Sequence, residues 1–230
     1  MNSEFGLPRT AIVTGGARRI GAALVRALAA DGWHVAIHCN TSRDEADALC
    51  AELRAAGQGA HVIVADLADA GSAAQIVAQA QVDAPPLGML VNNASRFDYD
   101  TISDFDVSGW DRHLDVNLRA PALLTQAFSA ALPDGLSGLI VNLLDVKLYA
   151  LNPDYFSYTI SKFGLLGLTE LSARALAPRI RVAGIAPAVT MVSGPQSRDN
   201  FAAAHVHNPL ARGVTVEEIV GALRFIVATP

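Results

Sequence analysis

The sequence predicts an α/β fold in which helices cover both faces of a doubly wound parallel sheet. Short runs of β-branched and apolar residues alternate with longer Ala- and Leu-rich segments of helical period. The short runs show little alternation of apolar and polar residues, which is typical of strands buried on both faces. Because strands and helices alternate along the chain, right-handed crossovers between parallel strands are expected.

Six strands and six helices are expected in alternating order. The strands are expected at 10–14, 34–39, 61–65, 87–92, 138–143 and 180–185, where β-branched and aliphatic residues concentrate. The helices are expected at 20–31, 44–56, 72–81, 110–131, 155–177 and 216–227. Gly32 and Gly57 follow the first two helices, as glycine commonly does at a helix end. Without a linker or repeat, residues 1–230 are expected to form one dinucleotide-binding domain.

Composition excludes several classes of protein. The chain has 230 residues, of which 51% are hydrophobic and 17% charged, so it can bury a large core. A net charge of −5 argues against nucleic acid or an anionic membrane as the main partner. No signal peptide or membrane span is recognised. Cys39 and Cys50 form no C-x-x-C pair, so reduced thiols and a cytoplasmic location are expected. His205 and His207 have no carboxylate or thiol ligands nearby in the sequence, so no metal site is expected there.

A glycine-rich turn follows the first strand, with the sequence Thr-Gly-Gly-Ala-Arg-Arg-Ile-Gly over residues 14–21. Gly15 and Gly21 permit a tight turn and close approach of backbone to a ligand. The helix that follows offers unpaired N–H groups to a pyrophosphate. Since ligands of such sheets bind at the carboxyl ends of the strands, this turn predicts a dinucleotide site.

The segment after the second strand indicates which dinucleotide binds. Sites specific for NAD place a carboxylate about 20 residues beyond the glycine loop, where it binds the ribose 2′-hydroxyl. Here the neutral donors Asn40, Thr41 and Ser42 precede Arg43, and Arg18 is expected to face them from the glycine loop. Such a set suits a 2′-phosphate, so NADPH is the expected cofactor.

Tyr158 and Lys162 lie four residues apart and therefore on one helix face. A nearby ammonium stabilises phenolate, so Lys162 is expected to lower the pKa of Tyr158 from its usual value. Such a tyrosine can give a proton to a carbonyl or imine while a nicotinamide supplies hydride. The alternative is a surface tyrosine beside an unrelated lysine.

Taken with the glycine loop, Asn92-Asn93-Ala94 and Asn117, this pair resembles the short-chain dehydrogenase/reductase family over about residues 11–227. The resemblance implies a Rossmann-type fold, with Tyr158 as acid/base, Lys162 also holding the nicotinamide ribose and Asn117 anchoring a water relay to Lys162. It places Asp66 and Leu67 beside the adenine, Asn93 and Ala94 beside the adenine ribose, and Pro187 and Thr190 beside the nicotinamide. It also implies cofactor contacts at Arg19, Ile20 and Ser95.

Asp145 departs from the family pattern. Most members have serine 13 residues before the tyrosine, where it orients a carbonyl oxygen, whereas an ionised aspartate only accepts hydrogen bonds. Asp145 suits a substrate with N–H groups or a site that needs a second proton source. With Arg19, Ser95 and Phe97 it resembles the pteridine reductase and dihydromonapterin reductase branch. That resemblance implies a pterin ring stacked between Phe97 and the nicotinamide.

Simpler interpretations remain for these residues. Asp145 caps a turn or pairs with Lys147, Phe97 packs in the core, Arg19 binds only cofactor phosphate, and Asp98 and Asp100 belong to a solvated loop. Two other functions also stay open. One is reduction of another carbonyl substrate, such as a 3-oxoacyl thioester. The other is a catalytically weak dinucleotide-binding sensor.

Three expectations concern the ends and surfaces of the molecule. The family usually continues beyond its last helix into a final strand, so either the sequence is shortened or the sheet ends one strand early. The segment 192–209 is expected to cover the substrate as a lid. By family resemblance, helices 110–131 and 155–177 pair in a homodimer or homotetramer.

Overall fold

The computed structural model describes residues 9–192, 199, 201 and 210–229. Six strands form one sheet in the order β3-β2-β1-β4-β5-β6, and every neighbouring pair is parallel. The strands are β1 Thr10–Val13, β2 His34–Cys39, β3 Ala60–Val64, β4 Leu87–Asn92, β5 Gly138–Leu143 and β6 Ile180–Ile185. This topology confirms the predicted doubly wound α/β class, and in the part of the chain described the sheet ends at β6.

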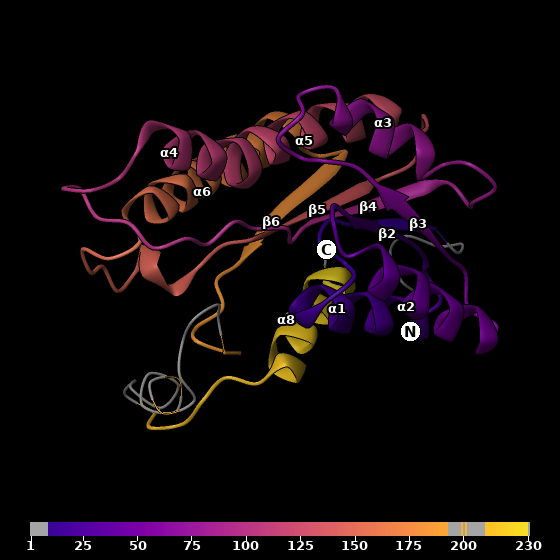
Figure 1. Ribbon diagram of the computed structural model, residues 1–230. Helices are drawn as coiled ribbons and strands as arrows, with labels where there is room; N and C mark the ends of the chain where they lie inside the picture. Colours follow the sequence, from indigo (N-terminus) through magenta and orange to yellow (C-terminus); the bar gives the residue numbers. More distant parts are fainter. Residues whose placement is uncertain (1–8, 193–198, 200, 202–209, 230) are drawn as a thin grey trace.

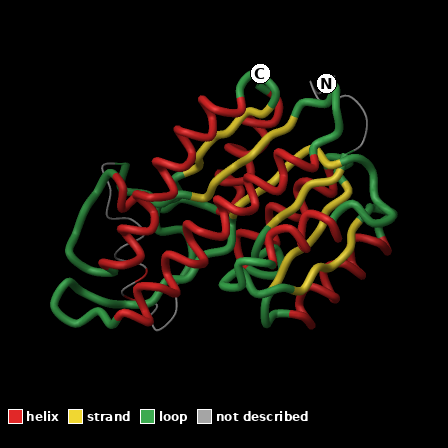
Figure 2. Tube along the Cα trace, turned by 90° about the horizontal axis from the view of Figure 1, so that it is seen from above, coloured by secondary structure: helices red, strands yellow, loops and turns green. Residues whose placement is uncertain are grey.

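Helices cover both faces of the sheet (Figures 1 and 2). On one face lie α1 Arg19–Ala30, α2 Arg43–Ala55 and α8 Val216–Ala228. On the other face lie α3 Ser72–Gln79, α4 Val107–Leu114, α5 Ala120–Ala131 and α6 Phe156–Leu176. The short segments η1, a π-helix at Asp115–Arg119, and η2, a 3₁₀ helix at Val146–Leu148, adjoin the carboxyl end of the sheet.

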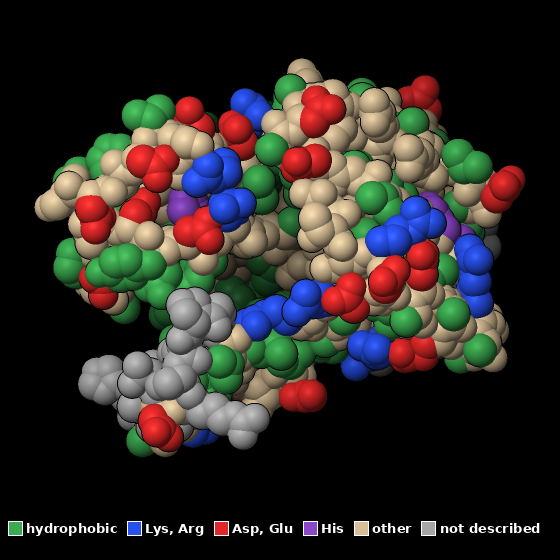
Figure 3. Space-filling view, in the orientation of Figure 1, with side chains coloured by type: hydrophobic (Ala, Val, Ile, Leu, Met, Phe, Trp, Pro, Cys, Tyr) green, Lys and Arg blue, Asp and Glu red, His purple; other side chains and the backbone are tan. Residues whose placement is uncertain are grey.

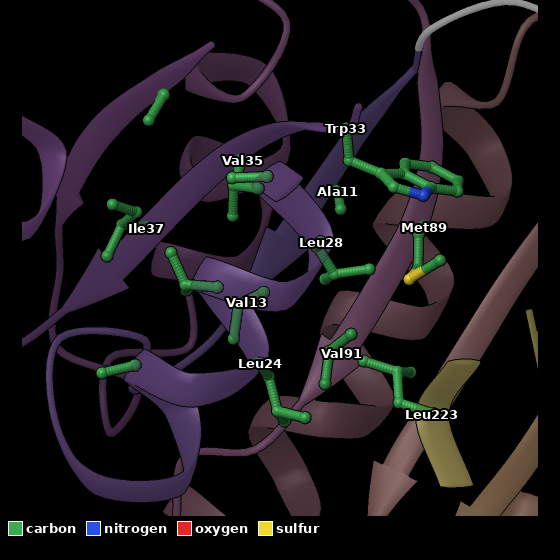
Figure 4. Packing of buried hydrophobic residues seen from close by; sticks show 14 of the residues in the cluster. Ala11, Val13, Leu24, Leu28, Trp33, Val35, Ile37, Met89, Val91 and Leu223 are labelled. Carbon is green, nitrogen blue, oxygen red and sulfur yellow. The ribbon is translucent and has the colours of Figure 1, made fainter. Parts of the chain in front are cut away.

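Each strand contributes side chains to two cores, because successive residues point to opposite faces. Val13 and Ile37 pack with Leu24 beneath the sheet, as Figure 4 shows. Ile12 packs on the other face with Leu124 and Phe128. All three residues of this second group are fully buried, which explains why the strand sequences carry so little polar alternation.

The structure differs from the predicted helix 110–131. The observed helix begins earlier, at Val107, and Asp106 caps α4 by accepting a hydrogen bond from the Gly109 amide at 2.7 Å. It is then interrupted by the π-helical turn η1 before α5 begins. No Gly or Pro marks the interruption within η1, and π-helical turns are frequent at functional sites.

The site is positioned by the strand order. β1 lies between β2 and β4, so the chain reverses its direction of winding at β1. The carboxyl ends of β1, β2, β4 and β5 therefore open onto one edge, at the topological switch point where such sheets bind ligands. Figure 3 shows a hollow between the two helical layers on this face, with basic side chains along its lower rim.

Candidate active site

The glycine loop packs tightly against the segment that follows β4. Gly15 has φ +60°, in the left-handed region that favours glycine. A Cβ on Gly21 would lie 2.1 Å from the Gly15 carbonyl oxygen, so only glycine fits there. The Asn93 amide donates to the carbonyl oxygens of Thr14 at 2.8 Å and Gly15 at 3.1 Å. Asn93, predicted as a cofactor contact, thus holds the loop itself.

The N-terminus of α1 fits a bound anion. Arg18 is extended and caps the helix without a side-chain hydrogen bond, and the first turn contains no acidic residue. The first-turn N–H groups of α1 therefore meet neither a side-chain cap nor a carboxylate of their own helix, as a pyrophosphate site requires. Ile20 lies in this same turn, half-buried against the core.

Arg19 adopts the left-handed conformation, with φ 55°. Its guanidinium donates a hydrogen bond to the Val192 carbonyl oxygen at 2.6 Å, which joins the glycine loop to the segment after β6. Arg19 and Thr190 line one cavity of about 610 Å³ together with Met191, Val192, Phe201, Val214, Thr215 and Val216. The structure thus brings together two residues that the sequence predicted as cofactor contacts.

Sequence reasoning missed His38, a buried side chain at the end of β2. Its Nδ1 accepts a hydrogen bond from the Gly15 amide at 3.3 Å, and its Nε2 lies 3.1 Å from the Ala65 carbonyl oxygen. Because a carbonyl only accepts, Nε2 carries the proton and Nδ1 is the acceptor. Burial lowers the pKa of His38 to about 4, so the ring is neutral. The sequence signal that could have identified His38 is a polar residue near the end of an otherwise apolar strand.

The residues predicted to bind a 2′-phosphate lie together between β2 and α2. Asn40 and Thr41 are exposed, and Ser42 is half-buried. Arg18 reaches across to Glu45 of α2 at 3.5 Å, while Arg43 pairs with Asp47 at 2.9 Å. The two guanidinium groups are exposed and flank this segment. Beyond β3, Asp66 is exposed and Leu67 is buried, and their contact with adenine stays a prediction.

Tyr158 and Asp145 form the polar centre of the site. The Tyr158 hydroxyl donates to Asp145 Oδ2 at 2.6 Å, and Asp145 Oδ1 accepts from the Lys147 amide at 2.8 Å. Asp145 therefore both caps η2 and contacts the tyrosine. Burial first, and then the Asp145 carboxylate, raise the pKa of Tyr158 well above its usual value. The expectation that the pKa of Tyr158 is lowered by Lys162 is therefore wrong.

Lys162 is buried beside Tyr158 but directed elsewhere. Its Nζ donates to the Leu143 carbonyl oxygen at 2.7 Å and lies 5.5 Å from the centre of the Tyr158 ring. Burial lowers the pKa of Lys162 to about 8, although the Asp145 carboxylate opposes that shift. Asp145, which bonds to the Tyr158 hydroxyl, therefore affects the pKa of Tyr158 more than Lys162 does. Lys162 itself remains a largely protonated cation near neutral pH.

Asn117 lies in η1 and joins two parts of the site. Its Nδ2 donates to Ser161 Oγ of α6 and to the Arg96 carbonyl oxygen, both at 2.9 Å. Its Oδ1 accepts from the Arg96 amide at 2.8 Å and from Ser95 Oγ at 3.3 Å. The side chain therefore ties the segment after β4, including Ser95, to the helix that carries Tyr158. The water relay from Asn117 to Lys162 stays a prediction.

Phe97 lies beside Tyr158, with ring centres 4.6 Å apart and planes at 84°. It also stacks on Tyr155 at 4.1 Å with nearly parallel planes, 10° apart. Because Phe97 is 37% exposed, its interpretation as core packing is wrong. Sequence reasoning missed Tyr155, which stands at the N-cap of α6, three residues before Tyr158.

The segment after β6 completes the site. The Val146 amide donates to the Pro187 carbonyl oxygen at 3.0 Å, which connects η2 with this segment.

Ala94, which follows β4, donates its amide to Thr14 Oγ1 at 3.0 Å, beside the glycine loop. Most of the predicted lid, with His205 and His207, lies outside the described residues. Within those residues no helix is long and apolar enough to cross a membrane.

Comparisons with known proteins show solved structures of the same fold. FolM alternative dihydrofolate reductase 1 from Brucella canis, in a crystal structure complexed with NADP, superposes with a TM-score of 0.92; it is 42% identical, and the match covers 96% of this chain and 88% of that one. A blue fluorescent protein from a metagenomic library, in complex with NADPH, gives a TM-score of 0.86 at 34% identity, covering 96% and 90%.

A 3-oxoacyl-[acyl-carrier-protein] reductase from Synechocystis sp. is 32% identical over 226 residues, which cover 96% of this chain and 90% of that protein. The profile of the short chain dehydrogenase family matches residues 9–200. A match of this extent, on a chain with the parallel sheet, the glycine loop and the Tyr158/Lys162 pair in place, shows that the chain belongs to the short chain dehydrogenase family.

Proposed function

We propose that this chain is an NADPH-dependent reductase of a dihydropterin. The observation that carries the proposal is the 2.6 Å hydrogen bond from Tyr158 to Asp145, formed beside the exposed ring of Phe97. A carboxylate only accepts hydrogen bonds, so it suits a ring that presents N–H groups. A flat heteroaromatic ring also suits stacking on Phe97. The resemblance to FolM alternative dihydrofolate reductase 1, at 42% identity, supports the same substrate class.

The residues at the carboxyl edge fit a nicotinamide dinucleotide phosphate. Gly15 and Gly21 let the glycine loop pack closely on itself and on the segment after β4, and the α1 N-terminus offers uncapped N–H groups. Asn40, Thr41 and Ser42, with the flanking arginines, would hold a 2′-phosphate. When bound, the cofactor supplies the hydride. The NADP and NADPH complexes of the similar structures support this assignment.

Tyr158 holds the proton that the reaction needs. Its raised pKa keeps the phenol protonated at neutral pH, so it is a proton donor rather than a phenolate. As hydride adds to the carbon of the C=N bond, the Tyr158 proton passes to the nitrogen. Asp145 accepts from Tyr158 before substrate binds and orients N–H groups of the ring afterwards. Lys162, buried and protonated, offsets the negative charge that develops on the tyrosine oxygen.

Reduction of a 3-oxoacyl thioester is the second candidate. The 32% identity to the Synechocystis reductase favours it, because that match covers nearly the whole of both chains. A thioester, however, has no flat ring with N–H groups for Asp145 and Phe97 to bind. A sensor without catalysis fits less well, since Tyr158, Lys162 and Asn117 remain together around one centre.

The test follows NADPH oxidation with dihydrobiopterin, dihydromonapterin and a 3-oxoacyl thioester in parallel. Turnover of a dihydropterin, abolished by Tyr158→Phe and strongly reduced by Asp145→Ser, is the expected result. Asp145→Ser should leave NADPH affinity nearly unchanged. Activity with the thioester alone would contradict the proposed substrate, and silence with all three in protein that binds NADPH would favour the sensor.

We also propose a homodimer or homotetramer formed through the helices at 110–131 and 155–177. Exposed apolar side chains on α6 support it, among them Phe163 at 40% and Leu171 at 70% exposure. Light scattering should give a mass above that of one chain, and Leu171→Glu should lower it.

We also propose a cytoplasmic location, where free thiols such as Cys39 and Cys50 persist.

A further inference from the structure

Two polar connections flank the contact between Phe97 and Tyr158. The first is Asn117, which bonds to Arg96, just before Phe97, and to Ser161, three residues after Tyr158. The second is Asp100, three residues after Phe97, which the sequence placed in a solvated loop. That interpretation is wrong for Asp100, because the residue is half-buried and bonded to the start of α6.

Asp100 accepts three hydrogen bonds from the first turn of α6. Its carbonyl oxygen accepts from the Phe156 amide at 3.2 Å, and its Oδ1 accepts from the Ser157 amide at 3.0 Å. Its Oδ2 accepts from the hydroxyl of Ser157, a residue that is fully buried. One residue of the segment after β4 therefore contacts both positions immediately before Tyr158.

Helix α6 lacks a cap from its own sequence. Tyr155 stands at the N-cap in a left-handed conformation, with φ 57°, and gives no side-chain cap hydrogen bond. First-turn amides need acceptors from outside the helix, and a negative charge near them is favourable for the helix dipole. Asp100 supplies both from a position 57 residues away in the sequence.

The middle of the same segment is also held. The Asp98 amide donates to His113 Nε2 at 3.1 Å, and His113 is buried in α4. Arg96, Asp98 and Asp100 are thus each held by a hydrogen bond, while Phe97, between Arg96 and Asp98, lies against Tyr158. Of these fixed points, Asp100 is the one bonded directly to backbone N–H groups of α6.

We propose that Asp100 is a positioning residue, which fixes the wall formed by Phe97 at its distance from the proton donor Tyr158. The inference rests on the proposed function of Tyr158. Asp100 and Asn117 together tie both sides of Phe97 to both sides of Tyr158. Loss of Asp100 releases the segment after Phe97 from the start of α6, so the substrate ring on Phe97 is no longer held at a fixed distance from the Tyr158 hydroxyl. The glycine loop is not affected.

The test compares Asp100→Ala, Asp100→Asn and Asp106→Ala in the full-length protein. Asp106 is a matched control because it caps α4 in the same region and contacts no residue of α6 in the hydrogen bonds described. In Asp100→Ala, kcat/KM should fall on the order of 10- to 100-fold, with KM raised and kcat lowered, as misplacement of reacting groups predicts. NADPH affinity should stay unchanged. Asp100→Asn should recover most activity, because its amide oxygen still accepts from Ser157.

A double-variant cycle separates positioning from a general loss of stability. In the Phe97→Ala background, Asp100→Ala should raise KM much less than in the wild type, since the wall is already gone. Additive effects, or kinetics of Asp100→Ala equal to those of Asp106→Ala, would overturn the inference. The kinetics use whichever of the three substrates the wild type reduces, so failure of the dihydropterin proposal is seen separately.

Amide hydrogen exchange gives a readout that needs no substrate. Exchange at Phe156 and Ser157 should speed up in Asp100→Ala and in the milder Ser157→Ala, but not in Asp106→Ala. Ser157→Ala serves if Asp100→Ala does not fold. Unchanged exchange in both variants would show that Asp100 does not hold α6, whatever the enzyme reduces.

Discussion

Replacement of Asp145 by Asn is expected to lower the pKa of Tyr158. Asparagine keeps the shape of the side chain and an oxygen acceptor but removes the charge that lies 2.6 Å from the Tyr158 hydroxyl. In the wild type, deprotonation of Tyr158 would place two negative charges side by side in a buried site. The carboxylate is therefore one cause of the raised pKa, after burial itself.

The size of the energetic effect follows from two limits. A hydrogen bond to a charged group contributes about 1.5–3 kcal/mol. Repulsion between two charges about 4 Å apart, at an effective dielectric constant near 20, is about 4 kcal/mol. Asp145→Asn should thus favour the phenolate by about 2–4 kcal/mol and lower the pKa of Tyr158, while burial keeps part of the elevation.

The assay is tyrosinate absorbance during alkaline titration. Subtracting the curve of a matched Tyr158→Phe protein, once in the wild-type and once in the Asp145→Asn background, removes the contributions of Tyr99, Tyr149 and Tyr155. NADPH affinity, measured by fluorescence, is the control and should not change. A Tyr158 titration that is the same with and without the carboxylate would refute the assigned electrostatic role of Asp145.

Three further predictions concern the cofactor loop and protonation. Gly21→Ala should abolish NADPH binding measured by fluorescence, because its Cβ would lie 2.1 Å from the Gly15 carbonyl oxygen, whereas Gly221→Ala, which meets only open space, should bind normally. In the reductive direction kcat/KM should fall about tenfold per pH unit above pH 8, as Lys162 with a pKa of about 8 loses its proton; a constant rate through that range would contradict its role as a cation. His38 has a folded pKa of about 4, below its usual value, so the unfolded chain binds the proton more readily. The free energy of unfolding should therefore fall by up to about 3 kcal/mol as the pH drops from about 6.5 to about 4. Urea titrations should show this part of the pH dependence missing in His38→Gln, and equal pH dependence in both proteins would count against a buried neutral ring.

Local patterns predicted the fold, and the family resemblance supplied most residues of the candidate site. Continuous apolar runs mark buried parallel strands, and strand ends mark the edge where Gly15 and Asn93 meet. The family resemblance placed Asp145 in one site with Tyr158, but their direct hydrogen bond was seen only in the structure. Its effect on the pKa depends on burial and distance, which no spacing specifies.

Contacts between distant segments escaped sequence reasoning. Asp100 lies among polar residues that look solvated, and only the fold brings it against a helix that begins over fifty residues later. Tyr155 is one of several aromatic residues until its stacking on Phe97 is seen. The π-helical turn Asp115–Arg119 contains no Gly or Pro that would mark it in the sequence, and the bonds that Asn117 makes from it join segments far apart in the chain.

The most direct test of hydride transfer to a pterin uses NADPH carrying deuterium at the transferred position. The enzyme and a dihydropterin are incubated with the labelled cofactor, and the product is analysed by NMR and mass spectrometry. The account predicts one deuterium on the former C=N carbon of the tetrahydropterin, and none with Tyr158→Phe. A wild-type enzyme that leaves the dihydropterin unlabelled, while it labels the alcohol formed from a 3-oxoacyl thioester, would contradict it.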